Sequence, residues 1–117
     1  MLARSAAVQE FHMAFSDNLK TMPGVSHLAA LQLLDAEGEL RATIENKAGQ
    51  TGSLAVYNHL AQLYGAITPD AAKKGLELYA EHTEDARLNP GKHPNVDRLL
   101  GLLERGETLR IKQVFAL

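Results

Sequence analysis

The sequence contains no cysteine and no tryptophan, and only three tyrosines and three phenylalanines. Without thiols, the chain can form no disulfide, no thiolate metal site and no iron–sulfur cluster, and it has no cysteine nucleophile. The few aromatic residues do not lie in a basic stretch, so the sequence does not indicate a platform for stacking bases. The absence of cysteine fits a cytoplasmic protein, which is the location we expect.

The chain also lacks a strong excess of either charge and long apolar runs. The 12 basic and 14 acidic residues are spread along the chain and give a net charge of −2. Because there is no basic block, we expect no nucleic-acid partner. No apolar run approaches the ~20 residues that span a bilayer, so we expect no membrane partner either.

A chain of 117 residues with 45% hydrophobic content can build one domain with one core. We assign residues 13–117 to that domain. Residues 1–12 are poorly patterned, and we interpret them as an N-terminal extension or a frayed tail.

Hydrophobic periodicity predicts the element order α, β, β, α, α, α, β. The expected fold class is therefore α+β: a small antiparallel sheet, made of an N-terminal hairpin plus a C-terminal strand, packed against about three helices. If the last strand joins the hairpin, Arg110 and Lys112 would lie across from Glu39 and Glu45. The expected elements are a short helix at 16–22 capped by Ser16, strands at 28–35, 39–46 and 108–116, and helices at 53–64 (capped by Ser53), 69–88 (capped by Thr68) and 94–106.

The densest group of reactive side chains lies in residues 81–97, between the last two predicted helices; we call this segment the corner. His82, Lys92 and His93 are the candidate ligand-contacting groups, because loops between rigid elements often carry binding sites. We expect the residues that shape the loop to be Asn89, Asn95 and Asp97. A purely structural interpretation stays open, in which His82 only holds the loop against the helix.

The same segment allows a metal site as an alternative. Two imidazoles and a carboxylate, from His82, His93 and Asp85, are a ligand set that Zn²⁺ accepts. However, the sequence contains no HExxH motif or comparable ligand spacing, and we expect no cofactor.

A weaker candidate is an anion site where the predicted helix at 53–64 begins. Lys47, Gly52 and Ser53 surround a helix start, whose free N–H groups attract anions. The segment is not a P-loop, because no Gly-Lys-Ser/Thr follows four variable residues. Ser53 has no neighbouring base in the sequence, so the pattern does not indicate a nucleophile.

Two stretches resemble a known family. Glu45-Asn46-Lys47-Ala48-Gly49-Gln50-Thr51-Gly52-Ser53-Leu54-Ala55-Val56-Tyr57-Asn58 is one, and Ala80-Glu81-His82-Thr83 through Asn89-Pro90-Gly91-Lys92-His93-Pro94-Asn95 is the other. Together they resemble a small family of uncharacterised bacterial proteins, found mainly in proteobacteria, over roughly residue 13 to the end. The resemblance implies a bacterial, cytoplasmic, single-domain protein, and it assigns no activity and no site residue.

These observations favour a non-catalytic protein that binds a small ligand or a partner protein at the corner. One alternative is a metal-dependent enzyme that uses His82, Asp85 and His93. The other is a structural or self-association module, in which an exposed sheet edge such as the C-terminal strand pairs across a two-fold axis into a homodimer.

Overall fold

The computed structural model describes residues 14–117, so the extension expected at residues 1–12 lies outside the described part. That part contains five helices and three strands, which confirms the α+β class. None of the described helices has the length and apolar character needed to cross a bilayer. The elements are α2 (Phe15–Leu19), β1 (Leu28–Leu34), β2 (Leu40–Glu45), α3 (Thr51–Tyr64), α4 (Pro69–Tyr79), α5 (Glu81–Leu88), α6 (Pro94–Arg105) and β3 (Arg110–Phe115).

The three strands form one antiparallel sheet in the order β2-β1-β3. β1 is the most apolar strand and takes the central position, where both of its edges are paired. Arg110 and Lys112 therefore lie across from Leu34 and Gln32 of β1. The predicted pairing of these cations with Glu39 and Glu45 is wrong, because β1 lies between β3 and the β2 side of the hairpin.

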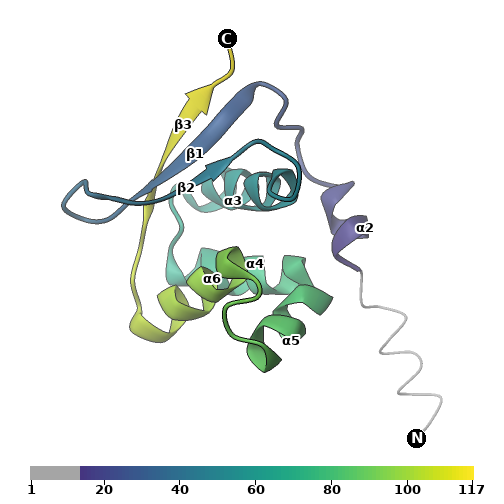
Figure 1. Cartoon of the computed structure of the whole chain (residues 1–117). Coiled ribbons are helices and arrows are strands. Elements are labelled where there is room, and N and C mark those ends of the chain that lie inside the picture. The colour runs from purple at the N-terminus through teal and green to yellow at the C-terminus, as the bar shows by residue number, and fades with distance from the viewer. Residues whose placement is uncertain (1–13) are drawn as a thin grey trace, which may run out of the picture.

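The sheet, α3 and the remaining long helices form successive layers (Figure 1). All helices lie on the same side of the sheet, and α3 is the helix that packs against it. Leu31, Leu33 and Ile44 point from the sheet into the core, where Leu54 and Leu60 of α3 are also fully buried. On its other side α3 contacts α4, which in turn contacts α6.

The helix predicted over residues 69–88 is broken in two at Ala80. Ala80 has φ 53° and ψ −115°, a backbone conformation that residues other than glycine rarely adopt. Thr83 Oγ1 donates a hydrogen bond to the Leu76 carbonyl at 2.6 Å, and the Ala80 N–H turns to Glu77 instead. The threonine hydroxyl thus takes the acceptor that a continuous helix would offer to Ala80, which ends α4 and lets α5 start in a new direction.

Two predicted helix caps are also wrong. α3 begins at Thr51 with Gln50 as N-cap, so Ser53 lies inside the helix. α2 begins at Phe15, after Ala14, so Ser16 is not a cap. The Thr68 cap is confirmed, since its hydroxyl accepts the Ala71 N–H at 3.0 Å.

Candidate functional site

Asp85 is the centre of the polar contacts at the corner. His93 Nε2 and Lys92 Nζ lie 2.6 and 2.9 Å from its Oδ2, and Asn89 Nδ2 lies 2.9 Å from its Oδ1. These donors, His93 first and Lys92 next, lower the pKa of Asp85 to about 2. Because an ionised carboxylate only accepts hydrogen bonds, Nε2 of His93 carries the proton, and Nδ1 is the ring nitrogen left for another partner.

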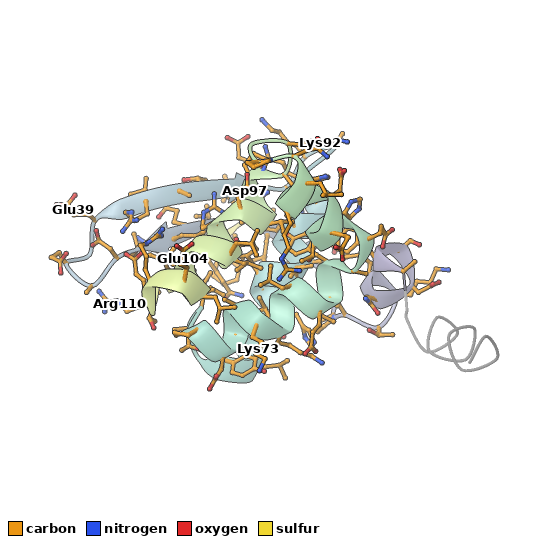
Figure 2. The ribbon with its side chains drawn as sticks, turned by 90° about the horizontal axis from the view of Figure 1, so that it is seen from below. Glu39, Lys73, Lys92, Asp97, Glu104 and Arg110 are labelled. Carbon is orange, nitrogen blue, oxygen red and sulfur yellow. The ribbon has the colours of Figure 1, made fainter. Side chains whose placement is uncertain are left out.

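The loop between α5 and α6 is shaped by two of the residues selected from the sequence. Asn89 donates to Asp85 as described, and the Lys92 N–H returns to the Asn89 carbonyl at 3.1 Å. Asp97 Oδ2 accepts the N–H of Gly91 at 2.9 Å, and Gly91 has φ 94°. The loop thus presents Lys92 outward while His93 turns back against α5 (Figure 2).

An aromatic wall adjoins the two histidines, and the sequence did not predict it. The centre of the His82 ring lies 5.2 Å from the centre of the His93 ring and 4.9 Å from that of Phe15. Phe15 in turn stacks on Tyr79, with the ring centres 5.1 Å apart. Glu81 Oε1 accepts the Phe15 N–H at 2.8 Å, which ties α2 to the first turn of α5 and lowers the pKa of Glu81. The only sequence signal was an aromatic residue at the start of the first helix, with nothing to indicate its partner.

Asn95 belongs to a different cluster from the histidines. Its carbonyl accepts a hydrogen bond from the Tyr57 hydroxyl at 2.6 Å, and its Oδ1 accepts one from Arg98 Nη1 at 2.8 Å. Burial raises the pKa of Tyr57 to about 12, so this hydroxyl is a neutral donor. Asn95 therefore fixes the start of α6 onto α3, in a hydrogen-bond cluster separate from that of the histidines.

The residues of the candidate anion site each have a contact within the protein. Lys47 Nζ pairs with Glu45 at 3.3 Å. Gly52 packs under Phe15, since a Cβ there would lie 3.3 Å from the Phe15 ring. Ser53 Oγ accepts the Tyr79 hydroxyl at 2.7 Å. The anion site stays a prediction from the sequence.

The metal alternative lacks the necessary grouping. Within residues 14–117, no three or more His, Cys, Asp or Glu side chains are arranged so that they could hold a metal ion. His93 and Asp85 do lie together, but they are hydrogen-bonded to each other at 2.6 Å through the atoms that would ligate a metal. His82 contacts the face of this pair through its ring.

A hollow lies on the other face of α5. It is an open groove of about 1270 Å³ between α4, α5, the start of α2 and the end of α6. Figure 2 shows Lys73, one of its lining residues, on the opposite side of the molecule from Lys92. Its charged rim alternates in sign, with Lys73, Lys74 and Arg87 beside Glu77, Glu81 and Glu84. No pattern in the sequence indicates this groove, because it depends on the break at Ala80.

The family profile described as "Uncharacterized protein conserved in bacteria (DUF2322)" matches residues 15–113. The chain therefore belongs to this bacterial family, as the resemblance of its two stretches predicted. No curated protein and no solved structure matches it. The family assigns no activity, so function is argued from the geometry of the corner.

Proposed function

We propose that this member of the family binds a small molecule carrying a carboxylate or phosphate group at the corner, through His82, Lys92 and His93, without catalysing a reaction on it. One observation carries the proposal. Three carboxylates of the corner, on Glu81, Asp85 and Asp97, accept hydrogen bonds from within the protein. Nδ1 of His93 and both ring nitrogens of His82 have no hydrogen-bond partner among residues 14–117.

The groups left for a ligand are a strong donor and several ring nitrogens. Lys92 Nζ contributes one N–H to Asp85 and keeps two others, and its side chain is 61% exposed. His93 is half-buried and retains Nδ1, which accepts a hydrogen bond in the neutral ring, and the half-buried His82 makes only ring contacts in the described part. The Lys92 ammonium favours an anionic ligand group, because charge-assisted hydrogen bonds are the stronger ones.

The aromatic wall supports the same assignment. The half-buried Phe15 lies against His82, with the buried Tyr79 stacked on it, so a ligand that contacts the histidines would have the Phe15 ring beside its anionic group. Small-molecule sites usually combine such a surface with a few converging polar groups.

The groove on the opposite face of α5 is a less suitable site for a small ligand. Its volume of about 1270 Å³ exceeds the 300–1000 Å³ that is typical of small-molecule pockets. Because positive and negative side chains alternate around it, the groove favours neither an anionic nor a cationic ligand.

A thermal-unfolding screen tests the proposal. The untagged protein is titrated with inorganic phosphate, phosphorylated metabolites and mono- and dicarboxylates. A ligand at 100 times its dissociation constant stabilises the fold by about 2.7 kcal/mol. For a domain of this size the Tm then rises by on the order of 10 °C. We expect such a rise for the wild type and its loss in His82→Ala and His93→Ala.

Two matched controls distinguish a role in ligand binding from a purely structural role of the corner residues. His59→Ala removes an imidazole from α3, and Lys73→Ala removes a lysine on the opposite side from Lys92. Both should keep the full ligand response, whereas Lys92→Ala should reduce it. If the histidine variants lower the Tm of the free protein but keep the ligand-induced rise, the corner is only structural and the proposal fails.

A further inference from the structure

β3 has one edge that is unpaired along most of its length. At the start of this edge, Leu109 exchanges backbone hydrogen bonds with Ile67, at 2.8 and 3.0 Å. Backbone groups in an antiparallel ladder alternate between the two neighbours, so Ile111, Gln113 and Phe115 point to the same side as Leu109. Within residues 14–117 no further strand pairs with that side, and β3 stands at the end of the sheet (Figure 1).

The opposite edge of the sheet, on β2, is partly closed. The Asn46 N–H bonds to Ala29 of the hairpin, so the alternation turns the backbone groups of Glu45 outward. The Glu45 N–H donates to Gln50 Oε1 at 3.2 Å, and its carbonyl accepts the Lys47 N–H at 3.0 Å. The loop therefore closes the β2 edge at Glu45, whereas on β3 the outward groups of Ile111, Gln113 and Phe115 lie beyond the one closed position at Leu109.

We propose that the free edge of β3 pairs with β3 of a second copy of the chain, antiparallel across a two-fold axis that passes beside Gln113. A strand that pairs with itself needs no second surface, and an isologous contact of this kind closes as a dimer. The two sheets would then continue into one. This interface lies away from the corner and does not depend on ligand binding there.

Charge argues against the neighbouring register on the Lys112 side. An axis beside Lys112 would also satisfy the backbone alternation, but it places Lys112 directly opposite its own copy, where side chains are closest and like charges repel. An axis beside Gln113 places Lys112 opposite Val114 instead. It also places Ile111 opposite Phe115, and aromatic with β-branched pairs stabilise neighbouring strands.

The exposed apolar side chains at the end of β3 also favour a second copy of the chain as the partner. Phe115 is 60% exposed although it lies within a strand, and Leu117 beyond it is fully exposed. In the proposed register, Phe115 of each copy covers the half-buried Ile111 of the other. A single short strand on each side buries less than the ~1200 Å² typical of stable complexes, so we expect a weak dimer that depends on protein concentration.

Sedimentation velocity over a range from low micromolar to millimolar protein tests the dimer. We expect the wild type to shift from monomer to dimer, and Phe115→Lys to remain a monomer. Leu40→Lys is the matched control, because Leu40 on β2 is similarly exposed at 55% and should leave dimerisation intact. A wild type that is monomeric throughout, or a dimer lost in Leu40→Lys and kept in Phe115→Lys, overturns the proposal.

Amide hydrogen exchange of the wild type provides a second test of the dimer, and it needs no variant. On raising the protein concentration, the amides of Ile111, Gln113 and Phe115 should become protected. Those of Lys112 and Val114 face β1 and should be protected at every concentration. Protection that does not follow this alternation would assign any dimer to another surface.

Discussion

α5 and α6 adjoin the corner from its two sides, but they are held in different ways. α6 buries Val96, Leu99 and Leu102, whereas α5 buries only Thr83 and Ala86. Full burial of one Leu side chain contributes about 1.5–3 kcal/mol. α6 is therefore held mainly by apolar packing, while α5 depends on hydrogen bonds from its side chains.

The ends of the two helices also differ, and again those of α6 are the more favourable for a stable helix. α6 starts with Pro94 at its first turn and ends at Gly106, which takes φ 64° as a left-handed C-cap. Neither helix has a side-chain N-cap, but α5 starts after the strained Ala80 and ends at Asn89 without a left-handed residue. α6 is therefore the fixed side of the corner. α5, which carries His82 and Asp85, is the side whose position depends on polar contacts.

The largest expected effect concerns the apolar side of this comparison. Leu99 of α6 is fully buried, and one of its methyl groups lies 2.6 Å from where a Cβ on Gly75 of α4 would stand. Leu99→Ala should lower the free energy of unfolding by about 2–5 kcal/mol, because it removes apolar contacts and leaves a cavity between α4 and α6. Chemical denaturation measures the loss. Leu103→Ala, on the same helix but 39% exposed, is the control and should lose far less.

A smaller loss is expected on the polar side. Thr83→Val keeps the shape of the side chain but leaves the buried Leu76 carbonyl without its donor at the break between α4 and α5. Denaturation should show a loss of about 1–3 kcal/mol, the range for an unsatisfied buried polar group. Thr83→Ser retains the hydroxyl and should recover most of that loss. If Thr83→Val is neutral, this hydrogen bond does not hold the junction.

Periodicity was sufficient to predict the apolar part of this architecture. In the helix predicted over residues 69–88, helical spacing places Ala72, Leu76, Tyr79, Thr83 and Ala86 on one stripe, and all five are buried. The stripe stays on the core side past the bend at Ala80. Gly38, between the two strands of the predicted hairpin, takes φ 82°, which suits glycine's conformational freedom.

Contacts between distant segments were not predictable in this way. Nothing near Phe15 in the sequence specifies that it stacks on Tyr79, 64 positions later, or that its N–H bonds to Glu81. The break at Ala80 depends on the hydroxyl of Thr83, which the helical pattern counts only as a core position. The corner was found because its own residues are close in sequence, but its aromatic wall and the groove behind α5 come from tertiary packing.

Removing the backbone strain at the junction should give a small gain. Ala80 has φ 53° and ψ −115°, and a sparsely populated backbone conformation of this kind costs about 1–3 kcal/mol. Ala80→Gly relieves this strain, although the more flexible unfolded chain offsets part of the gain. We expect denaturation to show a net stabilisation of up to about 1 kcal/mol. Ala55→Gly in the interior of α3 is the control and should destabilise by about 1 kcal/mol. An equal loss in both variants would contradict strain at Ala80.

The smallest expected effect is a pH dependence of the contacts that tie the α5–α6 loop to Asp85. His93 and Lys92 lower the pKa of Asp85 to about 2, from an ordinary value near 3.9. Folding therefore favours the ionised carboxylate, so this stabilisation is fully present above about pH 4 and is lost as the pH falls toward 2. Wild type and Asp85→Asn should differ in free energy of unfolding at neutral pH and converge over that acidic window. Because Lys92 and Asp85 are partly exposed, added salt should reduce the difference at neutral pH. A difference that stays constant down to pH 2 would mean that the loop is held without the charge of Asp85, and α5 would then resemble α6 more closely than its contacts indicate.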